Sequence, residues 1–200
     1  MGIGKVLLTL LVVFVVAMVA LGGCVVGGYN KAVRLDEEVK NRWAQVENQL
    51  QRRYELIPNL VETVKGVAAQ EKDIFLGIAK AREAYFASER KGVNEKAKAA
   101  SEFEGEYRSA LSRLLVLQER YPELRSNESF LKLQDSLEGT ENRLSVERQR
   151  FNEGVRELNT FTRTVLGRLY SGLAGVEKAE YFDAPESAQT APKVSFTKEG

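Results

Sequence analysis

Histidine is missing from this chain, and cysteine occurs once. Without histidine, the chain lacks the commonest general base, the commonest metal ligand and the usual pH switch near neutrality. A Ser-His-Asp triad, a Cys-His dyad and the zinc motif His-Glu-x-x-His are therefore excluded. The single cysteine, Cys24, excludes an intrachain disulfide and a cysteine-rich zinc site. We predict no cofactor.

An excess of charge of one sign is also lacking. The chain carries 29 basic and 28 acidic residues, and its formal net charge is +1. Because nucleic-acid-binding proteins usually carry a basic excess or stripe, we expect no nucleic-acid partner. The sequence also has no glycine-rich phosphate loop and no alternating strand pattern.

One long apolar run is present, over residues 6–26, and Lys5 is the only charged side chain in the first 30 residues. About 20 apolar residues in a helix cross the hydrocarbon core of a bilayer. We therefore predict a membrane anchor over residues 1–28, followed by a charged helical body. Gly27 and Gly28 separate the two parts and are a candidate hinge.

The kind of anchor is left open by the sequence. Leu21-Gly22-Gly23-Cys24 resembles a bacterial lipobox, in which the Cys24 thiol receives a lipid, and lipidation would place the body outside the cytoplasm. Val25 and Val26 prolong the apolar run, as in a plain spanning helix. A cleaved secretory signal peptide is the third interpretation.

Four segments after the anchor carry apolar residues at heptad spacing, which is typical of near-parallel helix packing. The first shows Val39, Trp43, Val46, Leu50 and Ile57. We expect Pro58 to end this helix, and Asn59 with Glu62 to cap the next one. The predicted helices cover residues 29–57, 60–88, 95–120 and 128–166. Together they predict an all-α fold, an elongated antiparallel four-helix bundle over residues 29–167 with a flexible tail over residues 168–200.

Polar residues at or near the seams are the candidate sites. Arg52 and Arg53 either contact a partner or headgroup, or bind the last carbonyls of their helix or Glu62. Another group, on the last helix, forms interhelix polar pairs or a binding site. Its members are Glu138, Glu141, Asn142 and Arg143. A carboxylate metal site is the alternative for Glu138 and Glu141, with Glu71 and Glu147 as further ligands.

Aromatic residues give two further expectations. Trp43 lies on the first seam and is predicted to be part of the core. Tyr181 and Phe182 stand together in the predicted tail, where they either fold back onto the bundle or dock a partner.

Residues 51–66, with the sequence QRRYELIPNLVETVKG, closely resemble the signature of the LemA family. Three further stretches agree with it: Tyr29-Asn30, the last-helix motif LEGTENR at residues 137–143, and the tail motifs AEYF and APKV at residues 179–182 and 191–194. The family has Phe-Pro where its last helix ends. This chain has Val165-Leu166-Gly167 there, so that helix end is not carried over.

The resemblance implies a bacterial, membrane-anchored protein with a helical-bundle domain and no established enzymatic activity. It also implies a membrane metallopeptidase or an envelope protein as the partner class. Our first hypothesis is a non-catalytic, membrane-tethered module that positions or regulates such a partner. The alternatives are a carboxylate-based metal protein or enzyme, and a protein that remodels lipid surfaces by self-association.

Overall fold

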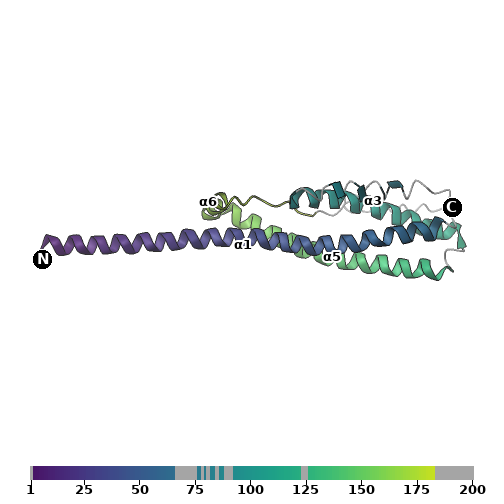
Figure 1. Cartoon of the computed structure of the whole chain (residues 1–200), viewed down its shortest axis with the longest axis horizontal. Coiled ribbons are helices and arrows are strands. Elements are labelled where there is room, and N and C mark those ends of the chain that lie inside the picture. Colours follow the sequence, from purple (N-terminus) through teal and green to yellow (C-terminus); the bar gives the residue numbers. More distant parts are fainter. Residues whose placement is uncertain are drawn as a thin grey trace, which may run out of the picture. The chain divides into compact units, whose positions relative to one another are not determined.

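Helices are the only regular elements in the part of the chain that the structure describes (Figure 1). This confirms the predicted all-α class. The helices are α1 (Ile3–Lys65), α3 (Val93–Arg120), α5 (Glu128–Arg163) and α6 (Val165–Ala174). The computed structural model describes residues 2–65, 76–77, 79, 82–83, 86–87, 92–122 and 126–182. Most of the predicted helix over residues 60–88, including Glu71, lies outside these ranges.

The chain divides into two compact units, and α1 and α5 contribute to both. The first unit comprises Met1–Asn41 and Glu153–Ala179, and the second comprises Arg42–Asn152 and Glu180–Gly200.

The first unit contains the apolar end of α1. Among the described helices, α1 is the one long and apolar enough to cross a membrane, by length and composition. Its apolar window has a mean hydropathy of 2.8, and none of that window is buried. Further along the same helix, Ala32, Leu35 and Val39 are buried. Val155 and Leu158 of α5, and Tyr170 of α6, are further buried residues of this unit.

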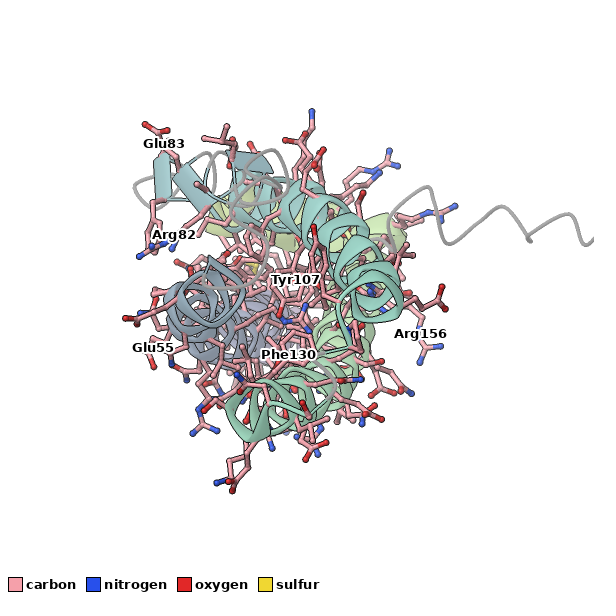
Figure 2. All side chains as sticks on the ribbon, turned by 90° about the vertical axis from the view of Figure 1, so that its right-hand side faces the viewer. Glu55, Arg82, Glu83, Tyr107, Phe130 and Arg156 are labelled. Atoms are coloured by element: carbon pink, nitrogen blue, oxygen red, sulfur yellow. The ribbon has the colours of Figure 1, made fainter. Side chains whose placement is uncertain are left out.

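Aromatic residues fill much of the second unit's core. Trp43 makes edge-to-face contacts with Phe151 and Phe182, with ring centroids 5.2 and 6.0 Å apart. The prediction that Trp43 belongs to the core is confirmed, because its side chain is only 2% exposed. Figure 2 shows Tyr107 and Phe130 pointing inward and Glu55 pointing outward.

The predicted end of the first helix at Pro58 is wrong. Helix α1 continues through Pro58 to Lys65, so Asn59 and Glu62 lie inside α1 and cap no helix start. A proline inside a helix removes one backbone hydrogen bond at a cost of about 3 kcal/mol. Pro58 lies on the exposed side of α1, next to the buried Ile57, so its ring does not disturb the packed face. Burying apolar side chains such as Ile57 contributes about 1.5–3 kcal/mol each, which offsets the loss.

Gly27 and Gly28 form no hinge, because both lie in the unbroken helix α1. Gly28 instead allows a close helix contact: a Cβ atom placed on it would lie 2.2 Å from the ring of Tyr170 on α6. The physical property that matters at residue 28 is therefore small size rather than backbone freedom.

The last long helix ends three residues before the predicted end. Helix α5 stops at Arg163, and Thr164 begins the short helix α6 by accepting a hydrogen bond from the Gly167 N–H. Ser, Thr, Asp and Asn are the preferred residues at such a position, because their side-chain oxygens accept from the free N–H groups of the first turn. Residues 168–174, assigned to the tail from the sequence, are therefore helical.

Candidate functional site

Arg53 is the centre of a buried charge cluster in the second unit. It lies on the packed face of α1, between Leu50 and Ile57, and its side chain is 0% exposed. The hydrogen bonds of its guanidinium run to carboxylates on two other helices, which neither prediction for Arg53 anticipated. The heptad register places residue 53 in the core regardless of its polarity, so its charge must be compensated there.

Two carboxylates from two other helices provide that compensation. The Arg53 guanidinium donates through Nη1 to Glu104 Oε2 of α3, and through Nη2 to Glu141 Oε2 of α5, the latter at 2.5 Å. Arg108, one turn after Glu104 on α3, donates to the other oxygen of Glu141. Two guanidinium groups thus face two carboxylates across α1, α3 and α5. We refer to Arg53, Glu104, Arg108 and Glu141 as the charge cluster.

Aromatic rings form the wall of the charge cluster. The Arg53 guanidinium lies 4.7 Å from the centroid of the Tyr107 ring, a cation–π distance. Tyr107 stacks on Phe103 at 5.7 Å, and Phe103 meets Tyr54 edge-to-face at 4.6 Å. These rings shield the Arg53–Glu104 ion pair from water, which strengthens that pair and increases the cost of breaking it, whereas Arg108 and Glu141 are each 33% exposed.

Burial changes the protonation of the charge cluster. It raises the pKa of the Glu104 carboxyl, and the nearby Arg53 guanidinium opposes this only in part. For Arg53, burial lowers the pKa, but Glu104 and Glu141 raise it, and the net direction is upward. Burial also raises the pKa of the Tyr107 hydroxyl. Arg53 and Tyr107 therefore stay protonated at neutral pH, whereas Glu104 binds a proton more readily than an exposed glutamate.

The charge cluster links α1, α3 and α5 and is closed to solvent at its centre. Arg53 and Glu104 are 0% and 1% exposed, so a substrate has no direct access to them. Removing each ion from water costs several kcal/mol, and only ion pairs and hydrogen bonds of good geometry offset that cost. Arg53 can satisfy both carboxylates only when the three helices are in this register. Buried polar groups are known to specify helix register in this way.

The carboxylates of the proposed metal site are separated and differently partnered. Glu141 is bound by Arg53 and Arg108, and Glu147 pairs with Arg150 at 2.8 Å. Glu138 is exposed. Among the described residues, no group of three or more potential ligands could hold a metal ion.

Of the residues singled out in the sequence, the structure brings together Arg53 and Glu141. Among the other described residues, Trp43 and Phe182 are buried and Glu147 is half-buried, and these lie at exposed positions: Cys24, Arg52, Asn59, Glu62, Glu138, Asn142, Arg143 and Tyr181. Glu141 makes the interhelix polar pair that was one of its two predicted roles. Sequence reasoning missed Glu104 and Arg108, which form one side of the charge cluster.

Two hydrogen bonds with Asn152 hold the backbone of Phe182 in the second unit. The Asn152 side chain donates to the Phe182 carbonyl at 3.0 Å and accepts from the Phe182 N–H at 2.8 Å. The Phe182 ring is 0% exposed and packs on Trp43, whereas the adjacent Tyr181 is 44% exposed. Of the two predicted alternatives, Phe182 therefore folds back onto the helices. Asn159, in the first unit, holds Ala179 by the same pair of hydrogen bonds.

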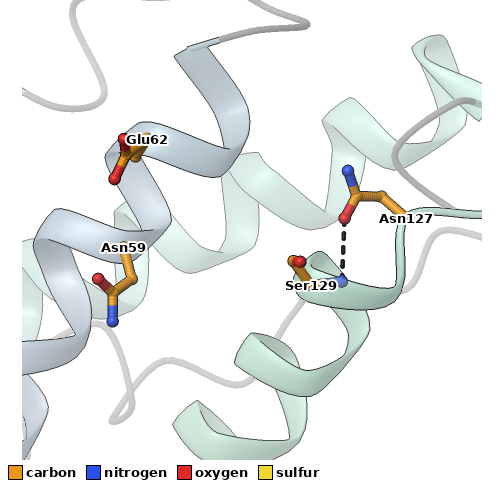
Figure 3. A pocket seen from close by; sticks show the side chains of 4 residues that line it. All are labelled: Asn59, Glu62, Asn127 and Ser129. Atoms are coloured by element: carbon orange, nitrogen blue, oxygen red, sulfur yellow. Dashed lines mark hydrogen bonds between the residues drawn. The ribbon is translucent and has the colours of Figure 1, made fainter.

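A shallow polar hollow of about 420 Å³ lies between α1 and the start of α5 (Figure 3). Asn59, Glu62, Asn127 and Ser129 line it. The Asn127 side chain accepts hydrogen bonds from the N–H groups of Ser129 and Phe130 at 3.0 and 3.2 Å, so its oxygen is used to cap α5. None of these four lining residues is a buried charged side chain that could orient a ligand.

The fold and its motifs define the class of protein. A model of the LemA family matches residues 42–196, which include α3, α5, α6 and the whole charge cluster. The chain belongs to the LemA family, as its motifs indicated.

Among known proteins, the chain is similar to magnetosome proteins of two bacteria. It is 25% identical over 210 residues to magnetosome protein MamQ of Magnetospirillum gryphiswaldense, covering 95% of this chain and 77% of that protein. It is 24% identical over 201 residues to magnetosome proteins MamQ 1 and MamQ 2 of Paramagnetospirillum magneticum, covering 90% of this chain and 74% of each.

Proposed function

We propose that this LemA-family chain is a non-catalytic, membrane-tethered helical protein that positions or regulates a protein partner at the membrane. One observation carries the proposal. Helix α1 is a single helix from Ile3 to Lys65 that is apolar and exposed in its first part and packed in its second. Exposed apolar side chains over that length require a nonpolar environment, which a bilayer provides.

We favour a spanning helix over a lipid anchor. Helix α1 continues through Leu21-Gly22-Gly23-Cys24 and Val26 without a break, which supports a spanning segment. Mass spectrometry of the mature N-terminus tests this inference. A chain that begins upstream of Cys24, with an unmodified thiol, supports it. A chain that begins at a lipidated Cys24 overturns it and places the body outside the cytoplasm.

The absence of catalysis is part of the proposal. The buried carboxylate Glu104 and its neighbour Glu141 are paired with arginines, which leaves them poorly suited as general bases or metal ligands. For the body, we propose the antiparallel four-helix bundle that the heptads predict. The ion pairs that join α1, α3 and α5 support that arrangement.

The partner class we propose is a membrane metallopeptidase or another envelope protein. Cross-linking in intact cells, followed by capture of the full-length chain, tests this. The matched variant replaces Val12, Val15 and Val19 by glutamate, because charges in the middle of a span strongly disfavour insertion. We expect a reproducible membrane-protein partner with the wild type and its loss with the variant. The proposal fails if the wild type captures no reproducible partner, or if the variant captures the same one.

A further inference from the structure

Helix α6 is a short, separately capped helix whose outer face is unusually apolar. At its start, the Thr164 side chain accepts from the Gly167 N–H at 3.0 Å. At its end, Gly175 adopts the left-handed conformation, with φ 65°, and Val176 N–H donates to the Ser171 carbonyl at 2.9 Å. This pattern is a Schellman motif, a common helix stop. Both ends of α6 are therefore set by the local sequence.

The two sides of α6 differ sharply. Gly167, Tyr170 and Ser171 are buried against the rest of the first unit. Successive steps of one, three and four residues place four large apolar side chains on another face. These are Val165, Leu166, Leu169 and Leu173, with exposed fractions of 89, 60, 57 and 60%. Helix α6 has no acidic residue, and its one charged side chain, Arg168, is exposed. A face of this kind indicates a nonpolar environment on that side of α6.

Contacts within the first unit fix where α6 lies along α1. Lys31 lies over the Phe161 ring of α5 at 5.2 Å, and Tyr170 of α6 lies against Gly28. The end of α5 therefore contacts α1 at residue 31, and α6 contacts it at residue 28, which is closer to the end of the apolar run at Val26. Two residues of helix correspond to about 3 Å, so α6 meets α1 directly beside the apolar run.

The direction of the apolar face follows from Gly167. A Cβ atom on Gly167 would lie 1.9 Å from the Phe161 carbonyl oxygen, so this side of α6 faces the end of α5. Val165 and Leu169 are about 160–200° away around the helix and face away from α5.

We propose that α6 is an interfacial membrane helix, which lies in the plane of the bilayer where α1 enters it. Its face of Val165, Leu166, Leu169 and Leu173 inserts at the boundary between headgroups and acyl chains, and Arg168 binds lipid phosphate. Amphipathic helices with basic flanks bind membrane surfaces in this way. The occupant is a lipid surface because the exposed face adjoins the wholly exposed apolar run of α1. This inference rests on the proposed membrane insertion of α1.

Site-directed spin labelling of the full-length chain tests the inference. The chain carries Cys24→Ser and is reconstituted in vesicles of phosphatidylcholine and phosphatidylglycerol. Single labels are placed by Leu169→Cys on α6, by Arg156→Cys on the exposed surface of α5, and by Val15→Cys in the apolar run. Collisions of each label with oxygen, which partitions into lipid, are compared with collisions with a water-soluble nickel chelate.

We expect the oxygen-to-nickel collision ratio at residue 169 to be several-fold higher than at residue 156. A ratio at residue 169 equal to that at residue 156, with a high ratio at residue 15, overturns the inference and leaves the anchor intact. A low ratio at residue 15 instead shows that membrane insertion itself has failed. Dipolar broadening between residue-169 labels on two chains identifies a second copy as the occupant and overturns the lipid assignment.

Discussion

The Tyr170 ring occupies the space that a side chain on Gly28 would need. A Cβ atom on Gly28 would lie 2.2 Å from two ring carbons, and 2.5 Å from a third. At the neighbouring Gly27, no side chain or other helix among the described residues comes within 4 Å of the same position. Substitutions at these two adjacent glycines therefore distinguish the effect of helix propensity from the effect of the contact between α1 and α6.

Gly28→Ala is expected to displace α6, because the new methyl group must push the Tyr170 ring out of its place. Overpacking of this kind costs about 1–3 kcal/mol. Gly27→Ala adds the same methyl group without a contact and should stabilise α1 by about 0.5–1 kcal/mol. Hydrogen exchange of residues 165–174 is the measurement. Faster exchange in Gly28→Ala alone confirms the prediction, and equal exchange in both variants contradicts it.

Arg53→Met is expected to destabilise the protein strongly, although methionine fills a similar volume. The change leaves the carboxylate of Glu104 buried without its guanidinium, and breaking a buried pair costs about 3–5 kcal/mol. Arg52→Met is the matched control, because Arg52 is exposed, and surface changes are usually within about 0.5 kcal/mol. Urea unfolding in detergent micelles, followed by circular dichroism, measures the difference. Similar midpoints for both variants would show that the charge cluster is not closed to water.

Adding Glu104→Gln and Glu141→Gln to Arg53→Met should restore part of the lost stability. The triple variant removes the Glu104 carboxylate that Arg53→Met leaves without a partner, together with Glu141, and replacing a whole buried ion group costs far less than breaking it. The same unfolding experiment measures the recovery. A triple variant less stable than Arg53→Met would show that the carboxylates stabilise the core without Arg53.

Glu104 should give the free energy of unfolding a specific pH dependence. Burial raises its pKa in the folded state above that in the unfolded state. Between these two pKa values the folded state binds more protons, so this group's contribution to stability is largest below the unfolded pKa and is lost as the pH rises through the folded pKa. Glu104→Gln should remove this slope, whereas Glu102→Gln, at an exposed position on the same helix, should keep it. Identical slopes in both variants, from urea titrations above pH 4, would contradict the prediction.

Phe182→Ala should release the C-terminal segment from the second unit, whereas Tyr181→Ala should not. Replacing a buried phenylalanine by alanine costs about 3–5 kcal/mol, and Phe182 is 0% exposed. Asn152→Ala should have a smaller effect in the same direction, because it removes both hydrogen bonds to Phe182. Limited proteolysis after residue 178 reports the release. Equal cleavage of the two aromatic variants would mean that Phe182 does not anchor the segment.

The helical class could be predicted because heptad spacing depends only on the alternation of apolar and polar residues. The same pattern contained the main site residue. Between Leu50 and Ile57 the seam advances seven residues, and Arg53 occupies the seam position between them, three residues after Leu50 and four before Ile57. A charged residue at a seam position predicts that it has a buried partner. The sequence does not identify that partner, because Glu104 and Glu141 come close to Arg53 only after α3 and α5 have packed.

Pro58 and Gly28 were misread for a related reason. Local propensity favours a helix end at proline and a break at paired glycines. In the structure, packing on either side carries α1 through both. Whether a proline ring faces solvent, or a glycine faces an aromatic ring, depends on residues far away in the chain. Tyr170 lies 142 positions after Gly28, and one sequence shows no link between them.

The charge cluster also limits how this sequence can change over generations. Replacing Arg53, Glu104 or Glu141 alone leaves an unbalanced ion inside the protein, so single replacements pass through an unstable intermediate. Arg53 and Glu104 should therefore drift together, or remain fixed while the exposed helix surfaces diverge. Among LemA proteins that have lost the arginine, Glu104 is expected to have been replaced as well, whereas Glu141 keeps Arg108 as a partner.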